Sequence, residues 1–194
     1  MTGNEQALRD GALAIVPTDT VYGIGCAAHR RDACERLYAC KSRLPDQPTA
    51  LVLGSVADLL EDVLPELTRR AGVLCRRVLP GPVTLIVPNP ARRFPHLCGT
   101  SPERIGVRVP VLMPEVARLA DAVGGLALTS ANLRGEPPPA RLADVPAALR
   151  DLCSFAVDGG VLAGTPSSVV DVTGPEPVLI RAGPDAESAL ARLR

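Results

Sequence analysis

Short apolar runs separated by polar turns recur along the whole chain, and most of them have the length of a strand. These runs predict β-strands at residues 13–16, 49–53, 83–87, 105–109, 126–128, 155–157, 168–172 and 178–180. Proline closes several of them, as at Pro17 and Pro110. Because proline cannot continue a strand ladder, the chain turns there into loops, where polar side chains can converge on a ligand.

Longer segments have the spacing of helices. Helices are predicted at residues 32–40, 56–61, 65–78, 114–123 and 184–194. In the first, Asp32 and Glu35 have the spacing of a capping box, and Ala33, Leu37 and Cys40 share one face. Helices and strands are mixed without strict alternation. The pattern therefore predicts an α/β fold with a twisted mixed β-sheet and flanking helices, and residues 1–194 have the length of a single domain.

The charge balance argues against a protein that grips long nucleic acids. The chain has 21 basic and 21 acidic residues, so its formal net charge is +0, and aromatic residues make up only 2%. Strong RNA binding usually needs a positive surface and aromatic stacking platforms. We therefore expect direct tRNA binding to be weak or absent.

Cysteines and hydropathy bear on the cellular compartment. None of the six cysteines forms a Cys-x-x-Cys pair, and the polar residues 1–10 do not resemble a targeting peptide. No apolar run of about 18 residues is present, so we expect no membrane span. Reduced, mostly buried thiols in a cytoplasmic protein are predicted, and the two histidines lack the spacing of zinc ligands.

Three cations occur where an anion could be bound. Lys41 and Arg43 follow a predicted helix, and in a loop both could reach one polyanion. A basic helix end favoured by the helix dipole is the alternative. Arg108 lies inside an apolar strand, where alternation places it on the same face as Gly106. Such an arginine needs an anionic partner, which is either a structural acid or a bound carboxylate or phosphate.

Small polar side chains at strand ends complete the candidate set. Residues 17–25 place Thr18, Asp19 and Thr20 before a Gly-x-Gly, as in a pocket wall or a locally capped turn. Ser130 and Asn132 could bind phosphate or ribose, or could simply cap a helical turn. A further hydroxyl pair begins at Ser167, and Arg181 follows the next predicted strand. Cations and hydroxyls together are suited to holding an anionic nucleotide rather than to proton transfer.

Taken together and in this order, the motifs resemble the YrdC-type threonylcarbamoyl-AMP synthase family in its short, single-domain form. The resemblance spans about residues 8 to 185. The segments that carry it are residues 17–23, Lys41-x-Arg43, residues 79–84, 107–110, Ser130-x-Asn132, residues 167–171 and 180–183. It implies a fold with a deep cavity, in which ATP with Mg²⁺, bicarbonate and L-threonine give threonylcarbamoyl-AMP and pyrophosphate. The product would serve tRNA modification through partner transferase proteins.

The resemblance also implies roles for individual residues. Thr20, Arg108 and Ser167 would contact threonine, and Lys41 and Arg43 would be catalytic. The nucleotide contacts would be Lys41, Arg43, Gln47, Ser130, Asn132 and Arg181. No residue is assigned as a metal ligand.

The sequence departs from the family pattern at several places. Leu44 stands where proline is usual, Thr49 replaces leucine, Leu79 replaces tryptophan, Arg104 replaces a small residue and Ser168 replaces threonine. These changes leave the cations in place but bear on substrate preference. Two other functions stay open: a related domain that transfers a carbamoyl group through carbamoyl-adenylate, and a non-catalytic RNA-binding module of the same fold.

Overall fold

All nine strands in the described part of the chain join one mixed sheet. The computed structural model describes residues 2–44 and 46–194. The strands are β1 (Ala14–Pro17), β2 (Tyr22–Ala27), β3 (Ala50–Val52), β4 (Val83–Pro88), β5 (Arg104–Arg108), β6 (Leu126–Ser130), β7 (Phe155–Ala156), β8 (Ser168–Asp171) and β9 (Val178–Arg181). Their order is β7-β1-β2-β6-β3-β5-β4-β8-β9, with parallel and antiparallel neighbours. The predicted α/β fold with a mixed sheet is confirmed.

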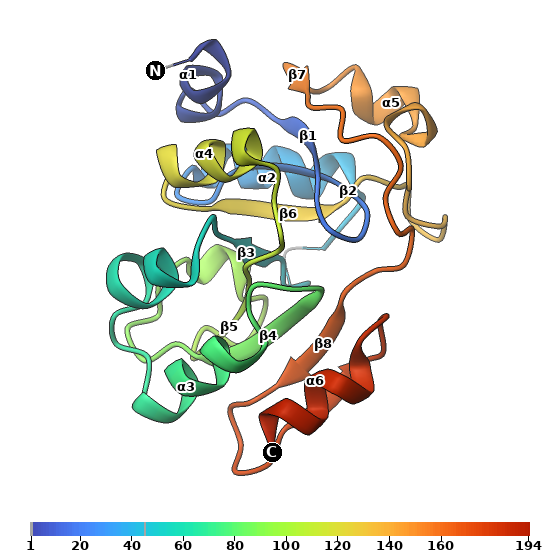
Figure 1. Ribbon diagram of the computed structural model, residues 1–194. Helices are drawn as coiled ribbons and strands as arrows, with labels where there is room; N and C mark the ends of the chain where they lie inside the picture. The colour runs from blue at the N-terminus through green and yellow to red at the C-terminus, as the bar shows by residue number, and fades with distance from the viewer. Residues whose placement is uncertain (1, 45) are drawn as a thin grey trace.

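Helices cover the sheet unevenly (Figure 1). The α-helices are α1 (Gly3–Arg9), α2 (Arg31–Cys40), α3 (Arg69–Val78), α4 (Pro114–Ala122), α5 (Ala147–Arg150) and α6 (Ala186–Leu193). A π-helix spans Asp58–Val63, and short 3₁₀ turns lie at Pro95–Leu97 and Leu142–Asp144. No helix in residues 2–44 or 46–194 is long and apolar enough to cross a membrane.

The two faces of the sheet have different coverings. On one face, Ile15 and Ile24 pack with Leu37 of α2 in the larger core cluster. On the other face, Val16 packs with Leu119 of α4 in a second cluster. This second face is covered by α4 near β1 and β6, whereas over β3, β5, β4 and β8 it forms the wall of a cavity.

Three sequence expectations need correction. The sequence pattern predicts no strand at residues 22–27, where the structure has β2. At Gly25 a Cβ atom would lie 2.4 Å from the Ala127 carbonyl oxygen, so glycine lets β2 approach β6 closely. The predicted capping box of α2 is absent, because Arg30 is the N-cap residue and its guanidinium engages Asp32 (Nε–Oδ1, 2.9 Å).

The third correction concerns a helix that the sequence pattern does not predict and two helices that begin later than expected. The capping box occurs instead in α1, a helix that the sequence pattern does not predict, where Thr2 and Glu5 cap each other. The helix expected at residues 56–61 is a π-helix that begins at Asp58, and the one expected at 65–78 begins only at Arg69.

Candidate functional site

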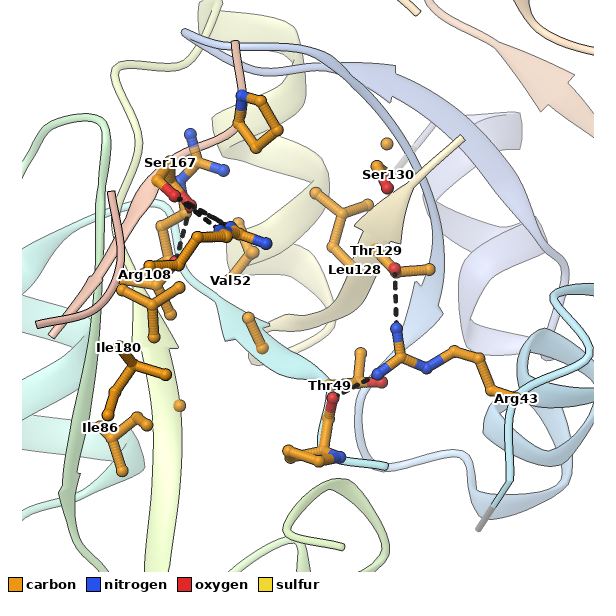
Figure 2. A pocket seen from close by; sticks show the side chains of 18 of the residues that line it. Arg43, Thr49, Val52, Ile86, Arg108, Leu128, Thr129, Ser130, Ser167 and Ile180 are labelled. Carbon is orange, nitrogen blue, oxygen red and sulfur yellow. Dashed lines mark hydrogen bonds between the residues drawn. The ribbon is translucent and has the colours of Figure 1, made fainter. Parts of the chain in front are cut away.

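A cavity of about 710 Å³ lies on the open part of the sheet (Figure 2). Its volume lies within the range of small-molecule sites. Side chains of alternate residues in β3, β4, β5 and β8 form its floor. The cavity brings together most of the predicted site residues from distant parts of the sequence, namely Arg43, Arg108, Ser130, Asn132, Ser167 and Arg181.

At one end of the cavity, Arg108 is held by a loop between β1 and β2. Arg108 is 7% exposed, and its Nη2 donates to Thr20 Oγ1 at 2.7 Å. The same nitrogen forms a salt bridge with Asp19, whose other carboxylate oxygen accepts the Val111 N–H at 3.1 Å. Of the two alternatives for Arg108, the structural acid is present, and because Arg108 also lines the cavity, its contact with a bound anion stays a prediction.

Burial and the neighbouring carboxylate act on the Arg108 guanidinium in opposite directions. Burial lowers the pKa of the Arg108 guanidinium, and Asp19 opposes this shift. As alternation predicts, Gly106 lines the cavity beside Arg108, and the nearest atoms to a Cβ at Gly106 would be 3.8 Å away. Thr20 is fully buried and does not line the cavity, so it supports the guanidinium from behind.

Ser167 and Arg181 belong to this same end. Ser167 Oγ lies 3.0 Å from Thr84 Oγ1, and Arg181 donates to the Ser167 carbonyl oxygen from Nε at 3.1 Å and Nη2 at 2.9 Å. Burial lowers the pKa of Arg181. The family resemblance groups Arg181 with the nucleotide contacts, whereas the structure places it against Ser167, a predicted threonine contact.

At the other end, Arg43 reaches the cavity from the loop after α2. The chain turns at Ser42, which has a left-handed φ of 47°, and the Arg43 guanidinium lies 5.8 Å from the centroid of the Tyr38 ring. Arg43 Nη1 donates to Thr129 Oγ1 at 3.3 Å, and Nη2 donates to the Pro48 carbonyl oxygen at 2.6 Å. Burial lowers the pKa of this guanidinium as well.

Lys41 lies behind the wall at this end rather than on it. Its Nζ donates to the Ser130 carbonyl oxygen at 2.8 Å, to the Asn132 carbonyl oxygen, and to Asn132 Oδ1 at 3.4 Å. Burial is the largest cause that lowers the pKa of Lys41 to about 8. Lys41 therefore fixes the turn that carries Ser130 and Asn132, two predicted nucleotide contacts.

Gln47 is also outside the cavity wall. Its Oε1 accepts the Leu44 N–H at 3.3 Å, so the side chain closes a turn within the loop. The structure does not bring Gln47 together with the other candidate residues, and its contact with a nucleotide stays a prediction.

Unsatisfied polar atoms mark the two ends of the cavity. Among the described residues, three buried side-chain nitrogen or oxygen atoms have no hydrogen-bond partner: Arg43 Nε, Thr49 Oγ1 and Arg108 Nε. All three residues line the cavity. Buried polar groups normally have partners, so three unsatisfied groups around one cavity indicate a ligand site.

Sequence reasoning missed three polar residues of the site. Asp19 belongs to the polar segment 17–25 and Thr84 ends the segment 79–84, but the sequence pattern assigns neither of them a role. Thr49 stands out only as a departure from the family pattern, although a threonine in an otherwise apolar strand is itself a signal for a polar contact.

Comparison with known proteins finds a matching family model and several relatives. The family model Sua5_yciO_yrdC, described as telomere recombination, matches residues 6–183. The chain is 31% identical over 177 residues to the threonylcarbamoyl-AMP synthase of Pyrococcus abyssi, covering 91% of this chain and 52% of that protein. It is 34% identical over 200 residues to the human threonylcarbamoyl-AMP synthase, covering 96% of this chain and 68% of the relative. The chain thus spans about half the length of the archaeal relative.

A solved structure of a relative has the same fold. The crystal structure of P. abyssi Sua5 complexed with L-threonine superimposes with a TM-score of 0.81 at 29% sequence identity. The match covers 98% of this chain and 57% of that chain.

Proposed function

Because this chain belongs to the Sua5/YciO/YrdC family, we propose that it joins L-threonine, bicarbonate and ATP into L-threonylcarbamoyl-AMP and releases pyrophosphate. Relatives that carry this activity in their names align with nearly the whole chain. The product would supply the threonylcarbamoyl group for modification of an adenosine in tRNA, through partner transferase proteins.

The position of the unsatisfied donors is the observation that carries this proposal. Arg108 Nε lies at one end of a single cavity, and Arg43 Nε and Thr49 Oγ1 lie at the other. Two separated donor sites in one cavity are suited to two anionic groups. A guanidinium fork binds a carboxylate, as in threonine, and a second cation binds a phosphate, as in ATP.

The chemistry assigns a task to each end. The threonine amine takes up bicarbonate as a carbamate, with loss of water, and a carbamate oxygen then attacks the α-phosphorus of ATP while pyrophosphate leaves. Arg108, with Thr20 and Ser167 around it, holds the amino acid. Arg43, Ser130 and Asn132 hold the nucleotide, so that the two reactants meet in the middle of the cavity. Positive charge at the phosphoryl oxygens stabilises the negative charge that builds up there.

The cavity is compatible with Mg²⁺ that enters with ATP. No group of three His, Cys, Asp or Glu side chains within the described residues is arranged to hold a metal ion, but Asp46 and Asp171 lie on the cavity wall. Mg²⁺ is usually bound through phosphates and only one or two carboxylates, which this wall can provide. When bound, the ion supplies neutralising charge to the phosphates.

Pyrophosphate release from ATP tests the proposal. The purified chain is assayed with all substrates, without threonine, and in carbonate-free buffer. We expect release only when threonine and bicarbonate are both present, with threonylcarbamoyl-AMP detected by mass spectrometry. Release that needs bicarbonate but no threonine would overturn the proposal and favour carbamoyl transfer. Release that needs only threonine would indicate simple amino-acid adenylation.

A further inference from the structure

Thr49 has a buried hydroxyl group that nothing in the described protein engages. The residue is 4% exposed, and its backbone N–H donates to the Leu97 carbonyl oxygen at 3.0 Å, which fixes its position just before β3. Its Oγ1 is buried, lacks a hydrogen-bond partner and belongs to a residue of the cavity wall. A valine would fill the same volume without leaving a polar atom unsatisfied, so the unpaired hydroxyl indicates a contact with a ligand.

Arg43 lies next to Thr49, and one of its three guanidinium nitrogens has no hydrogen-bond partner. In Figure 2 the two labelled residues lie beside each other, and Arg43 Nη2 donates to the carbonyl oxygen of Pro48, the residue before Thr49. Nη1 is engaged by Thr129 and the guanidinium rests against the Tyr38 ring. These contacts fix the guanidinium plane and leave Nε as the donor without a partner.

Tyr38 is the neighbour that could otherwise satisfy Thr49. The Tyr38 hydroxyl has a single proton, which it donates to the His96 carbonyl oxygen at 3.3 Å. The Tyr38 oxygen could still accept a proton from Thr49, but Thr49 Oγ1 has no hydrogen-bond partner among the described residues. The hydroxyl proton of Thr49 is therefore free to be donated to an acceptor in the cavity.

We propose that Thr49 Oγ1 and Arg43 Nε together bind oxygen atoms of one phosphate group of the ATP polyphosphate. This inference rests on the proposed function and adds a phosphate contact at a position where the family pattern usually has leucine. Both groups are hydrogen-bond donors and one carries positive charge, a combination that favours an oxyanion over a neutral base or ribose. A phosphate has enough acceptor oxygens to satisfy both.

Calorimetric titration with the ATP analogue AMP-PNP and Mg²⁺, in the absence of threonine and bicarbonate, tests the contact without turnover. Thr49→Val removes the hydroxyl and keeps the shape. We expect its Kd for the analogue to rise roughly tenfold, in line with a hydrogen bond to a charged group. Inorganic pyrophosphate should lose affinity in parallel, adenosine should not, and Thr49→Ser should restore binding of the analogue.

Thr84→Val is the matched control, because Thr84 is also a buried threonine of the cavity wall but lies at the Arg108 end. It should leave the affinity for the analogue within about twofold of wild type, whereas Thr49→Val should leave threonine binding unchanged. Unchanged affinity of Thr49→Val for the analogue would overturn the inference. So would a rise only in the concentration of bicarbonate needed for turnover, which would place bicarbonate at Thr49.

A structural role of the Thr49 hydroxyl gives a different result from a phosphate contact. If Thr49→Val and Tyr38→Phe lower the melting temperature equally and neither changes analogue binding, the Thr49 hydroxyl is a structural partner of Tyr38 and the inference is wrong. If wild type binds the analogue but shows no threonine-dependent pyrophosphate release, the proposed function fails while the phosphate contact stands.

Discussion

The two ends of the cavity each present a buried arginine, but the arginines differ in their partners. Arg108 forms a salt bridge with Asp19, whereas no salt bridge joins Arg43 or Lys41 to any described residue. Around Arg108 the hydroxyls and backbone groups are already bonded to one another, as in the pair Ser167–Thr84. Arg108 Nε is the one buried side-chain atom without a partner at that end among the described residues, whereas around Arg43 both Arg43 Nε and Thr49 Oγ1 lack partners.

Under the proposed function, this contrast would let one cavity distinguish two substrates. Asp19 does not line the cavity, but it offsets the charge of Arg108 from behind the wall, so this end suits the single carboxylate of an amino acid better than a polyanion. Two cations without a paired acid present a net positive charge, which favours a polyphosphate. In the proposed function, charge pairing at the wall, more than the number of arginines, would therefore direct the amino acid to one end and the nucleotide to the other.

Removing Arg43, which lies at the end of the cavity where no acid pairs with the cations, should have the largest effect. We expect Arg43→Ala to lower kcat/KM for ATP by about 100-fold, because a charged hydrogen bond contributes about 1.5–3 kcal/mol and Lys41, which points to the backbone of Ser130 and Asn132, cannot take over the contact. Threonine binding, measured by calorimetry, should change little. The control is Arg104→Ala, an exposed arginine of the same wall that pairs with Asp171, which should change kcat/KM less than threefold. Equal losses in both variants would remove the distinction between the two ends.

At the end where Arg108 pairs with Asp19, the expected effect is smaller, and it concerns both threonine binding and the stability of the fold. Arg108→Lys keeps the charge but loses the planar fork, so the KM for threonine should rise roughly tenfold. The bond to Asp19 should also weaken, and a loss of about 1 kcal/mol would lower Tm by about 2–4 °C. ATP affinity should be unchanged.

Asp19→Asn separates these two parts of the Arg108 effect. It removes the ion pair but retains the guanidinium fork, so Tm should fall while the KM for threonine rises less than in Arg108→Lys. If Arg108→Lys lowers Tm and leaves the KM for threonine within twofold of wild type, Arg108 is a structural residue and the contrast between the ends loses its functional meaning.

Part of this contrast can be predicted from the sequence, because the alternation of apolar and polar residues and the residue types are local properties. The alternation in residues 105–109 correctly places Arg108 and Gly106 on one face, and the apolar runs predict most strands. The pairing of Arg108 with Asp19 cannot be derived, since the two residues are 89 positions apart and meet only through the order of strands in the sheet. The grouping of Arg181 with Ser167 depends likewise on the pairing of β8 with β9.

Strand β2 and Lys41 show a different limit of sequence reasoning. Glycines that permit close strand packing look like loop residues in the sequence, so the pattern does not reveal β2. Lys41 lies beside Ser130 and Asn132, the residues with which the family resemblance groups it, but the direction of its side chain cannot be foreseen. Its side chain points to the backbone of residues 130–132 rather than into the cavity, because three oxygen atoms there match the three protons of an ammonium group.

The pH dependence of nucleotide binding should reveal this role of Lys41, with the smallest of the expected effects. Because burial holds the pKa of Lys41 at about 8, well below its ordinary value of 10.5, the ammonium loses its proton as pH rises through 8. A neutral amine has two protons and a lone pair, so it cannot donate to three oxygens, and it loses the positive charge near the phosphates. Affinity for AMP-PNP should therefore fall severalfold between pH 7.5 and 9, while affinity for threonine changes less.

The free energy of unfolding should change with pH in the opposite direction to the nucleotide affinity, and this difference tests the role assigned to Lys41. Between pH 8 and 10.5 the unfolded chain still binds a proton at this lysine while the folded chain does not, so this residue makes a contribution to the free energy of unfolding that increases with pH in that window. Lys41→Met should lack both the loss of nucleotide affinity and this gain in stability relative to wild type. NMR observation of the Lys41 side chain should give a midpoint near 8. A midpoint near 10.5 would show a solvated lysine at an ordinary helix end, and the turn of Ser130 and Asn132 would then depend on contacts other than this ammonium group.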